Sequence, residues 1–182
     1  AVVLINEILI CIEAHYLEDK KVVLFVGRLT AVKNLDFLIQ SFNKLPDKQK
    51  EISTLVLVGS GDKERDLMGL VEQLKLQNKV IFPGRFENEE LYGWYLLADY
   101  FVLPSTYEPF GAVVNEALIF GLPVLCSSNA GASALINSEN GTIFDPDDKQ
   151  GFIDLLIKSI EKTSTRESPI KERKNLMPFL YD

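Results

Sequence analysis

The stretch VVLFVGRLTAVKNLDFLIQSFNKLP, residues 22–46, encodes a strand followed by a helix. Its first five residues are all apolar and rich in β-branched side chains, which is typical of a strand buried on both faces of a sheet. Gly27 ends this run. Apolar residues then recur at helical spacing, so we expect a helix from Asn34, its N-cap, to Leu45, with Pro46 as its stop. The stretch therefore predicts the first strand and crossover helix of a βαβ unit.

The same alternation of strand-like and helix-like runs continues along the chain. The further expected strands are residues 55–58, 80–82, 100–103, 123–126 and 142–144. The further expected helices are residues 62–76, 88–98 with Asn88 as the cap, 111–120 and 148–162. Strand–helix alternation with short links predicts an α/β fold with a doubly wound, mostly parallel sheet. Ligands bind outside the carboxyl ends of the strands in such sheets, so we expect the functional residues in the loops after the strands.

Size and composition bound the class of protein. The 182 residues fit one domain with a substantial core, and 47% hydrophobic and 25% charged residues indicate a globular chain. We assign residues 1–162 to this domain and residues 163–182 to a polar C-terminal tail, which is either loosely packed or cut from its natural docking surface. The net charge of −7 argues against nucleic acid or an anionic membrane as a partner of the whole surface. A few local cations can still bind a small anion.

Simple features indicate the setting in which the chain works. No apolar run approaches the ~20 residues needed to span a bilayer, and the apolar N-terminal run lacks the basic residues of a signal peptide. Because the chain begins without Met, we expect it to be part of a longer protein. Cys11 and Cys126 each lie in an apolar run, which indicates buried free thiols in a reducing compartment. His15 has no cysteine or carboxylate cluster at ligand spacing, so we expect no metal site.

Two cations follow the first strand. Gly27 allows a sharp turn, and Arg28 and Lys33 then lie on the loop between strand and helix. A guanidinium and an ammonium are complementary partners for a diphosphate, whose charge is spread over several oxygens. The alternative is that both are ordinary solvated surface cations, and this segment alone leaves the two interpretations open.

Two carboxylates in the segment YEPFGAVVNEA, residues 107–117, are the strongest functional signal. Glu108 follows a predicted strand, and Glu116 lies about two turns into the helix that Gly111 opens, so both can line one cleft above the sheet edge. The N-terminus of that helix offers free N–H groups that suit a phosphate. Either residue could instead be solvated, but apolar residues on both sides make Glu116 a poor candidate for a solvent-facing position.

Two further loops carry weaker signals. Gly59-Ser60-Gly61 resembles a phosphate or ribose loop, but Glu64 stands where the last glycine of G-x-G-x-x-G belongs. A tight turn capped by Asp62 is the favoured interpretation. The segment from Val80 to Arg85 ends a strand at the same edge, where backbone groups could bind a base or simply complete the core.

Together these motifs resemble the C-terminal, donor-binding domain of retaining glycosyltransferases with the GT-B fold, namely glycosyltransferase family 4, or group 1. The resemblance covers residues 16–160, and the order and spacing of six motifs agree. The motifs are Val26-Gly27-Arg28-Leu29 with Lys33-Asn34, Leu57-Val58-Gly59-Ser60-Gly61, Val80-x-Phe82-x-Gly84, Ala98-Asp99 with Leu103-Pro104-Ser105, Glu108-Pro109-Phe110-Gly111 with Glu116-Ala117, and Gly121-Leu122-Pro123-Val124. The resemblance implies a Rossmann-like half of a GT-B fold.

The resemblance also implies a catalytic set of three residues. Arg28 and Lys33 would bind the donor diphosphate and stabilise the leaving group, and Glu108 would contact the transferred sugar. Departure of a nucleoside diphosphate builds negative charge, which fixed cations and a helix N-terminus can stabilise without a metal. The family is described as retaining by front-face attack, so Glu108 is not assigned as a nucleophile.

The remaining donor-binding roles come from the same resemblance. Glu116 would hold the ribose hydroxyls, and the backbone of Phe110 and Gly111 would approach sugar and phosphate. Gly27 would let the chain pass close to the donor. Ile81, by its place in its motif, would offer backbone hydrogen bonds to the base.

The chain departs from the family pattern in two ways. Ala134 stands where the family usually has the Glu of a Gly-Gly-x-x-Glu segment, which puts in doubt any contact of that Glu. A GT-B enzyme also needs an N-terminal domain that supplies the acceptor site, and 182 residues leave no room for it.

The implied function is transfer of a hexosyl group from a UDP- or GDP-sugar to a saccharide or lipid-linked acceptor, without cofactor or metal. We expect the enzyme in the cytoplasm, with the intact protein peripherally associated with a membrane. Alternatives are another GT-B activity, such as a sucrose- or trehalose-type synthase or an epimerase, or a degenerate binding module that has lost its chemistry.

Overall fold

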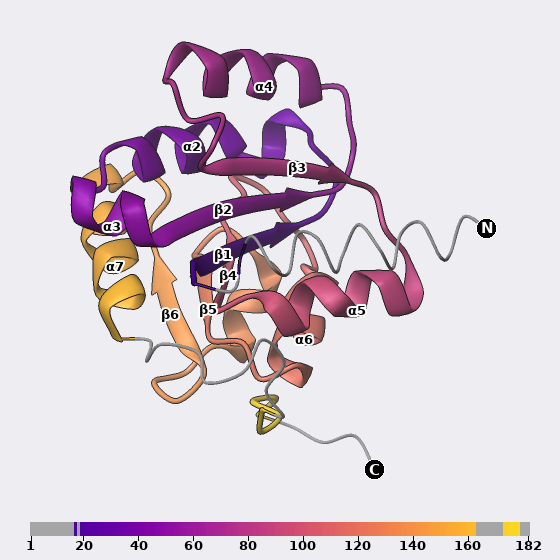
Figure 1. Ribbon diagram of the computed structural model, residues 1–182. Coiled ribbons are helices and arrows are strands. Elements are labelled where there is room, and N and C mark those ends of the chain that lie inside the picture. Colours follow the sequence, from indigo (N-terminus) through magenta and orange to yellow (C-terminus); the bar gives the residue numbers. More distant parts are fainter. Residues whose placement is uncertain (1–16, 18, 163–172, 179–182) are drawn as a thin grey trace.

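In the computed structural model, which describes residues 17, 19–162 and 173–178, six strands form one sheet (Figure 1). All neighbouring strands run parallel, in the order β3-β2-β1-β4-β5-β6. This order confirms the predicted doubly wound sheet, whose two halves wind outward from the centre. The strands are β1 (Lys21–Val26), β2 (Ser53–Val58), β3 (Val80–Gly84), β4 (Tyr100–Leu103), β5 (Val124–Ser127) and β6 (Gly141–Phe144).

The strands β1 and β2 are deeply buried in the sheet. β1 and β2 pair along their whole lengths, from Lys21 opposite Ser53 to Val26 opposite Val58. Every residue of β2 is buried, as is every residue of β1 after Lys21. Continuous apolar runs are required here because helices cover both faces of the sheet.

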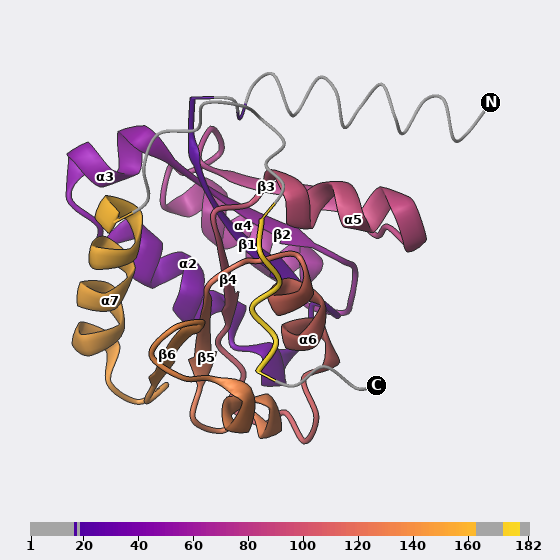
Figure 2. The same ribbon diagram turned by 90° about the horizontal axis from the view of Figure 1, so that it is seen from below.

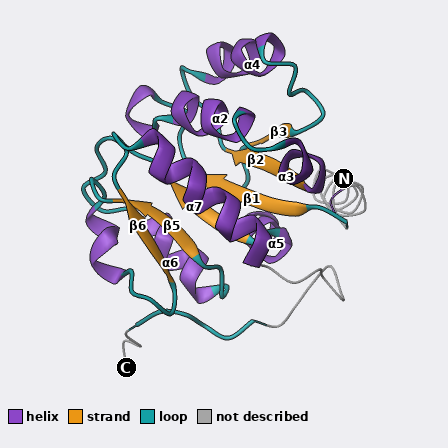
Figure 3. Ribbon diagram, turned by 90° about the vertical axis from the view of Figure 1, so that its left-hand side faces the viewer, coloured by secondary structure: helices purple, strands orange, loops and turns teal. Residues whose placement is uncertain are grey.

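The helices form a layer on each face of the sheet (Figure 3). One layer contains α2 (Leu35–Asn43), α3 (Asp47–Ile52), α4 (Glu64–Gln73) and α7 (Lys149–Lys162), and the other contains α5 (Asn88–Leu97) and α6 (Ala112–Ile119). Within the described residues, no helix combines the length and apolar character needed to cross a membrane.

The helix starts differ from the sequence-based expectations. Asn34 occupies the N-cap position of α2 in a left-handed conformation, with φ 56°, and its side chain does not cap the helix. Its Nδ2 donates instead to the carbonyl of Pro104, 3.2 Å away. α4 begins at Glu64 and not at the predicted Asp62. Asn88, the predicted cap of α5, is its first helical residue, also with positive φ.

One helix was missed, and one segment packs more closely than expected. Pro46 stops α2 as predicted, but α3 begins directly after it, since proline suits a helix start. α3 is polar and buries only Gln49, so it carries no apolar periodicity. Part of the tail expected to pack loosely is held against the body: the backbone N–H of Leu176 donates to the carbonyl of Leu118 at 2.8 Å. Figure 2 shows this segment in yellow alongside α6.

The two cysteines and the histidine had been expected to be structural. Cys126 is a buried free thiol, as predicted, whereas Cys11 and His15 lie outside the described residues. Burial, reinforced by the negative charge of Glu108, raises the pKa of the Cys126 thiol to about 12. The thiol is therefore protonated and inert near neutral pH.

Candidate functional site

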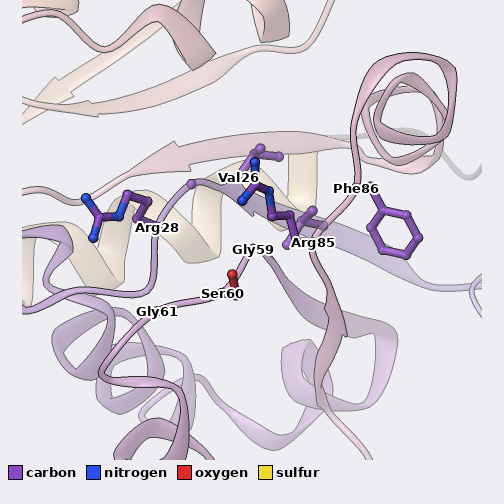
Figure 4. A pocket seen from close by; sticks show the side chains of 9 residues that line it. Val26, Arg28, Gly59, Ser60, Gly61, Arg85 and Phe86 are labelled. Carbon is purple, nitrogen blue, oxygen red and sulfur yellow. The ribbon is translucent and has the colours of Figure 1, made fainter.

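A cavity of about 420 Å³ lies at the carboxyl ends of β1, β2 and β3 (Figure 4). Two arginines line it, Arg28 from the loop after β1 and Arg85 from the segment after β3. The other lining residues are Val26, Gly27, Val58, Gly59, Ser60, Gly61 and Phe86. The cavity thus combines two cations with exposed backbone, in a protein whose overall charge is negative.

Backbone hydrogen bonds hold the three loops of this cavity together. Gly59 donates its N–H to the carbonyl of Gly84 at 2.8 Å, and Leu29 donates to the carbonyl of Ser60 at 3.0 Å. Gly59 has φ +141°, and a Cβ there would lie 1.8 Å from the carbonyl oxygen of Gly27. The Gly59–Gly61 turn is therefore required for close loop packing, as predicted, and it also forms a wall of the cavity. The predicted cap at Asp62 is wrong, because Lys63 occupies the N-cap position of α4.

Lys33 and Glu108 form an ion pair at the adjoining part of the same edge. Lys33 lies in the short 3-10 turn η1 (Ala31–Lys33) after β1, and Glu108 lies in the loop after β4. Their side chains are only 17% and 14% exposed, so Lys33 is not the solvated surface cation of the alternative interpretation. The pair sits where the strand order reverses, because β1 and β4 are neighbours in the sheet.

Two further contacts lock these loops together. The backbone N–H of Thr106 donates to the carbonyl of Val32 at 2.9 Å. The bond from Asn34 to Pro104 described above joins the same two loops. The ion pair is thus held from both sides by contacts that do not involve the charged groups.

Glu108 is also bound by the start of α6. Its Oε1 accepts hydrogen bonds from the N–H groups of Gly111, at 3.2 Å, and Phe110, at 3.4 Å. Partial burial alone would raise the pKa of Glu108, but Lys33 and these two N–H groups outweigh it and hold the pKa below its usual value. The Gly111 N–H expected to be free for a phosphate is therefore bonded to Glu108.

Glu116 lies one turn into α6, not two as its spacing suggested, and its partner is a tyrosine of α5. The hydroxyl of Tyr95 donates to Oε2 of Glu116 at 2.7 Å. Glu116 is half-buried, as its apolar neighbours in the sequence predicted.

The predicted site residues fall into three groups. Gly27 and Arg28 line the cavity, whereas Lys33, Glu108, Phe110 and Gly111 gather at the start of α6. Phe110 exposes 83% of its surface there. Ile81 pairs with Val56 inside the sheet and does not line the cavity.

The sequence analysis assigned no role to the side chains of Arg85, Phe86 and Tyr95. Arg85 and Phe86 line the cavity beyond the end of β3, where Ile81 had been expected to act. The position of Arg85 directly after the strand-ending Gly84 was the signal that could have identified it. No sequence feature pointed to Tyr95, because it lies among apolar residues of a helix, where the pattern predicts a core residue.

The segment that departs from the family pattern lies beside this site. Ala134 is exposed on the 3-10 turn η2 (Gly131–Leu135), and the N–H of Gly131 donates to the backbone carbonyl of Glu108 at 2.8 Å. Within the described residues, no group of three or more histidine, cysteine or carboxylate side chains is arranged to hold a metal ion.

Comparison with known proteins gives the family. The sequence pattern described as "Glycosyl transferases group 1" matches residues 12–176. An uncharacterised glycosyltransferase of Methanocaldococcus jannaschii is 41% identical over 122 residues, which are 67% of this chain and 31% of that protein. The mannosylfructose-phosphate synthase of Agrobacterium fabrum is 36% identical over 140 residues, covering 72% of this chain and 31% of the relative.

Solved structures agree with the sequence relatives. Anabaena HepE, determined in complex with UDP and glucose, superposes with a TM-score of 0.73 at 26% identity, covering 84% of this chain and 42% of HepE. This chain spans about a third of the length of the curated relatives that it matches. The matched family pattern spans most of the chain, and the fold agrees with that of solved glycosyltransferases, so the chain belongs to the group 1 glycosyltransferases.

Proposed function

We propose that this chain is the donor-binding domain of a retaining, metal-independent glycosyltransferase that uses a UDP- or GDP-sugar. The observation that carries the proposal is the placement of the Lys33–Glu108 pair beside the arginine-lined cavity, at the switch point of the sheet. Ligands of doubly wound sheets bind at this point. The structure of HepE with UDP and glucose supports the same class of ligand.

The cations suit the chemistry of the leaving group. As the bond to a nucleoside diphosphate breaks, negative charge grows on the phosphate oxygens, and prepositioned cations stabilise it. Arg28 can donate two parallel hydrogen bonds to such oxygens. The Lys33 ammonium has three N–H donors, so it can bind a phosphate while it keeps its contact with Glu108.

The carboxylates then serve the uncharged parts of the donor. Glu108, whose Oε1 accepts a hydrogen bond from the N–H of Gly111, would accept another from a hydroxyl of the transferred sugar. Glu116 would accept from the ribose hydroxyls. The walls near Arg85 and Phe86 would receive the base, in place of the role first expected for Ile81.

The acceptor belongs to the part of the relatives that this chain does not span. A saccharide or a lipid-linked saccharide is the acceptor we propose, bound by a second domain, with the enzyme in the cytoplasm. The mannosylfructose-phosphate synthase among the relatives supports a phosphorylated sugar as a second candidate. A degenerate binding module is the third, and Ala134 is the residue that favours it.

The test is calorimetric titration of UDP, GDP and ADP into the protein and its Lys33→Ala variant. We expect one nucleotide to bind, and Lys33→Ala to weaken it about tenfold or more, because a charge-assisted hydrogen bond is lost. Lys50→Ala is the matched control, since it also removes a charge and an ion pair, with Asp47 at 3.1 Å. Failure of all three nucleotides to bind, or equal weakening by both variants, would overturn the proposed site.

Transfer assays on the intact protein separate the candidates. Consumption of a nucleotide-sugar that depends on an added saccharide supports the glycosyltransferase, whereas dependence on a phosphorylated sugar supports a synthase. Nucleotide binding without turnover under any acceptor would support the degenerate module.

A further inference from the structure

The ring of Tyr95 is packed between other aromatic rings beneath the site. The residue is completely buried, and its ring stacks on Phe120 with centroids 5.4 Å apart and an interplanar angle of 1°. Phe101 contacts it in a tilted arrangement at 6.0 Å. With the ring packed in this way, the hydroxyl meets α6 at Glu116.

The Tyr95 hydroxyl forms a hydrogen bond to the Glu116 carboxylate. It donates to Oε2 of Glu116 at 2.7 Å, a distance typical of a strong bond to a carboxylate. α5 and α6 are consecutive helices on the same face of the sheet (Figure 1), which brings these two side chains together across 21 residues of sequence. Burial, reinforced by the hydrogen bond to Glu116 and by its charge, raises the pKa of Tyr95 well above its usual value. The hydroxyl therefore always carries the proton that it donates.

We propose that Tyr95 is a positioning residue for the donor ribose: it fixes the plane of the Glu116 carboxylate so that Oε1 is presented to the ribose hydroxyls. The inference rests on the proposed function, because it assigns Glu116 to that sugar. A flexible glutamate loses rotamer freedom when it binds a ligand, and a partner that orders it beforehand removes that cost. Tyr95 itself touches neither the ribose nor the reacting atoms.

The competing explanation is that Tyr95 is only a core residue whose hydroxyl uses Glu116 as a convenient acceptor. Both explanations predict some loss of stability in Tyr95→Phe. Only positioning predicts that the loss of affinity depends on the ribose hydroxyls. The decisive readout is therefore the coupling between the substitution and the removal of a hydroxyl from the nucleotide.

The experiment measures the dissociation constant of the nucleotide that binds, together with its 2′-deoxy and 3′-deoxy forms, for wild type and Tyr95→Phe. We expect Tyr95→Phe to weaken the ribonucleotide about fivefold to tenfold, since a hydrogen bond to a charged group is lost. At least one deoxynucleotide should be weakened less than about twofold, because the oriented carboxylate then has no hydroxyl to accept from. In the intact enzyme, the KM for the donor should rise while kcat is unchanged.

Tyr92→Phe is the matched control. Tyr92 lies on the same helix, and its ring also contacts Phe120, at 5.3 Å, but it is 45% exposed. The same chemical change there should leave all affinities unchanged. Equal weakening of ribo- and deoxynucleotides by Tyr95→Phe, or no weakening at all, would overturn the positioning role.

Failure of the proposed function and failure of the role of Tyr95 give different results. If wild type binds no nucleotide, the proposed function falls and the inference falls with it. If wild type binds, and Glu116→Gln weakens the ribonucleotide while Tyr95→Phe does not, only the role of Tyr95 is lost.

Discussion

Lys33 and Glu108 are 75 residues apart in the chain, yet they form the central charged contact of the site. Each lies on a predicted loop, and each was expected to serve the donor. Their pairing was not predicted, because it depends on β1 and β4 being neighbours in the sheet. The positions of Gly27 and Arg28 at the cavity could be predicted from the sequence, because both directly follow β1. The apolar run of that strand was enough to identify it.

The ion pair predicts a pH-dependent contribution to stability. Glu108→Gln should lower the free energy of unfolding at pH 7 by about 1 kcal/mol, because a partly buried charged hydrogen bond is lost. The folded-state pKa of Glu108 is depressed, so this stabilisation is present above the unfolded pKa, about 4.3, and is lost as pH falls through the folded value. Urea unfolding at pH 7 and at pH 3 measures the difference.

The control for this prediction is an ion pair of the surface. Asp47, whose side chain is 93% exposed, pairs with Lys50, and Asp47→Asn should have no measurable effect at either pH. A difference between wild type and Glu108→Gln that is the same at both pH values would contradict the electrostatic explanation.

At the scale of elements, the start of α6 is tightly constrained. Gly111 has φ +79°, and a Cβ there would lie 2.9 Å from Cβ of Ala132 and 3.2 Å from Leu103. This residue lets the chain turn from Glu108 into the helix while its N–H bonds the Glu108 carboxylate. The helix itself was predictable from the sequence, but its first turn depends on these neighbours.

Gly111→Ala should therefore destabilise the protein by about 1–2 kcal/mol, since an alanine pays for the left-handed conformation. Nucleotide affinity should fall as well, because Glu108 is displaced. Gly69→Ala is the matched control: Gly69 is exposed within α4, and nothing lies within 4 Å of the added Cβ. That variant should be more stable by about 0.5–1 kcal/mol. Chemical denaturation measures the free energy of unfolding of both variants. Equal effects of Gly111→Ala and Gly69→Ala would contradict the requirement for glycine at position 111.

The whole molecule is built around the reversal of strand order between β1 and β4. The arginine-lined cavity lies on one side of that point, and Glu108 and α6 lie on the other. A donor that spans both would place its base and its transferred sugar at opposite ends.

At this scale we predict that the chain by itself binds nucleotide but transfers little sugar. The described residues provide donor-binding groups, whereas the acceptor is proposed to bind to a part of the relatives that this chain does not span. Assays of nucleotide-sugar consumption by this chain and by the intact protein, at equal donor occupancy, measure the difference. Robust transfer by this chain alone would contradict the prediction.

The sequence by itself determined the elements, the fold class and the family. Continuous apolar runs make buried strands, and apolar residues at helical spacing make helices, and both signals are local. The motifs that follow the strands were equally readable, because parallel strands bring their carboxyl ends to one edge. The helix α3 was not predicted, because it is polar and has no apolar periodicity. The predicted caps at Asn34 and Asn88 were wrong: both residues have positive φ, and the Asn34 side chain forms no capping hydrogen bond.

Only the tertiary structure decided which side chains meet. The pairing of Lys33 with Glu108 and the bond from Tyr95 to Glu116 join residues from different elements. That Arg85 and Phe86 line the cavity, and Ile81 does not, depends on where β3 ends against β2. Such contacts follow from strand order and register, which are set by packing across the whole sheet. Local patterns carry no information on them.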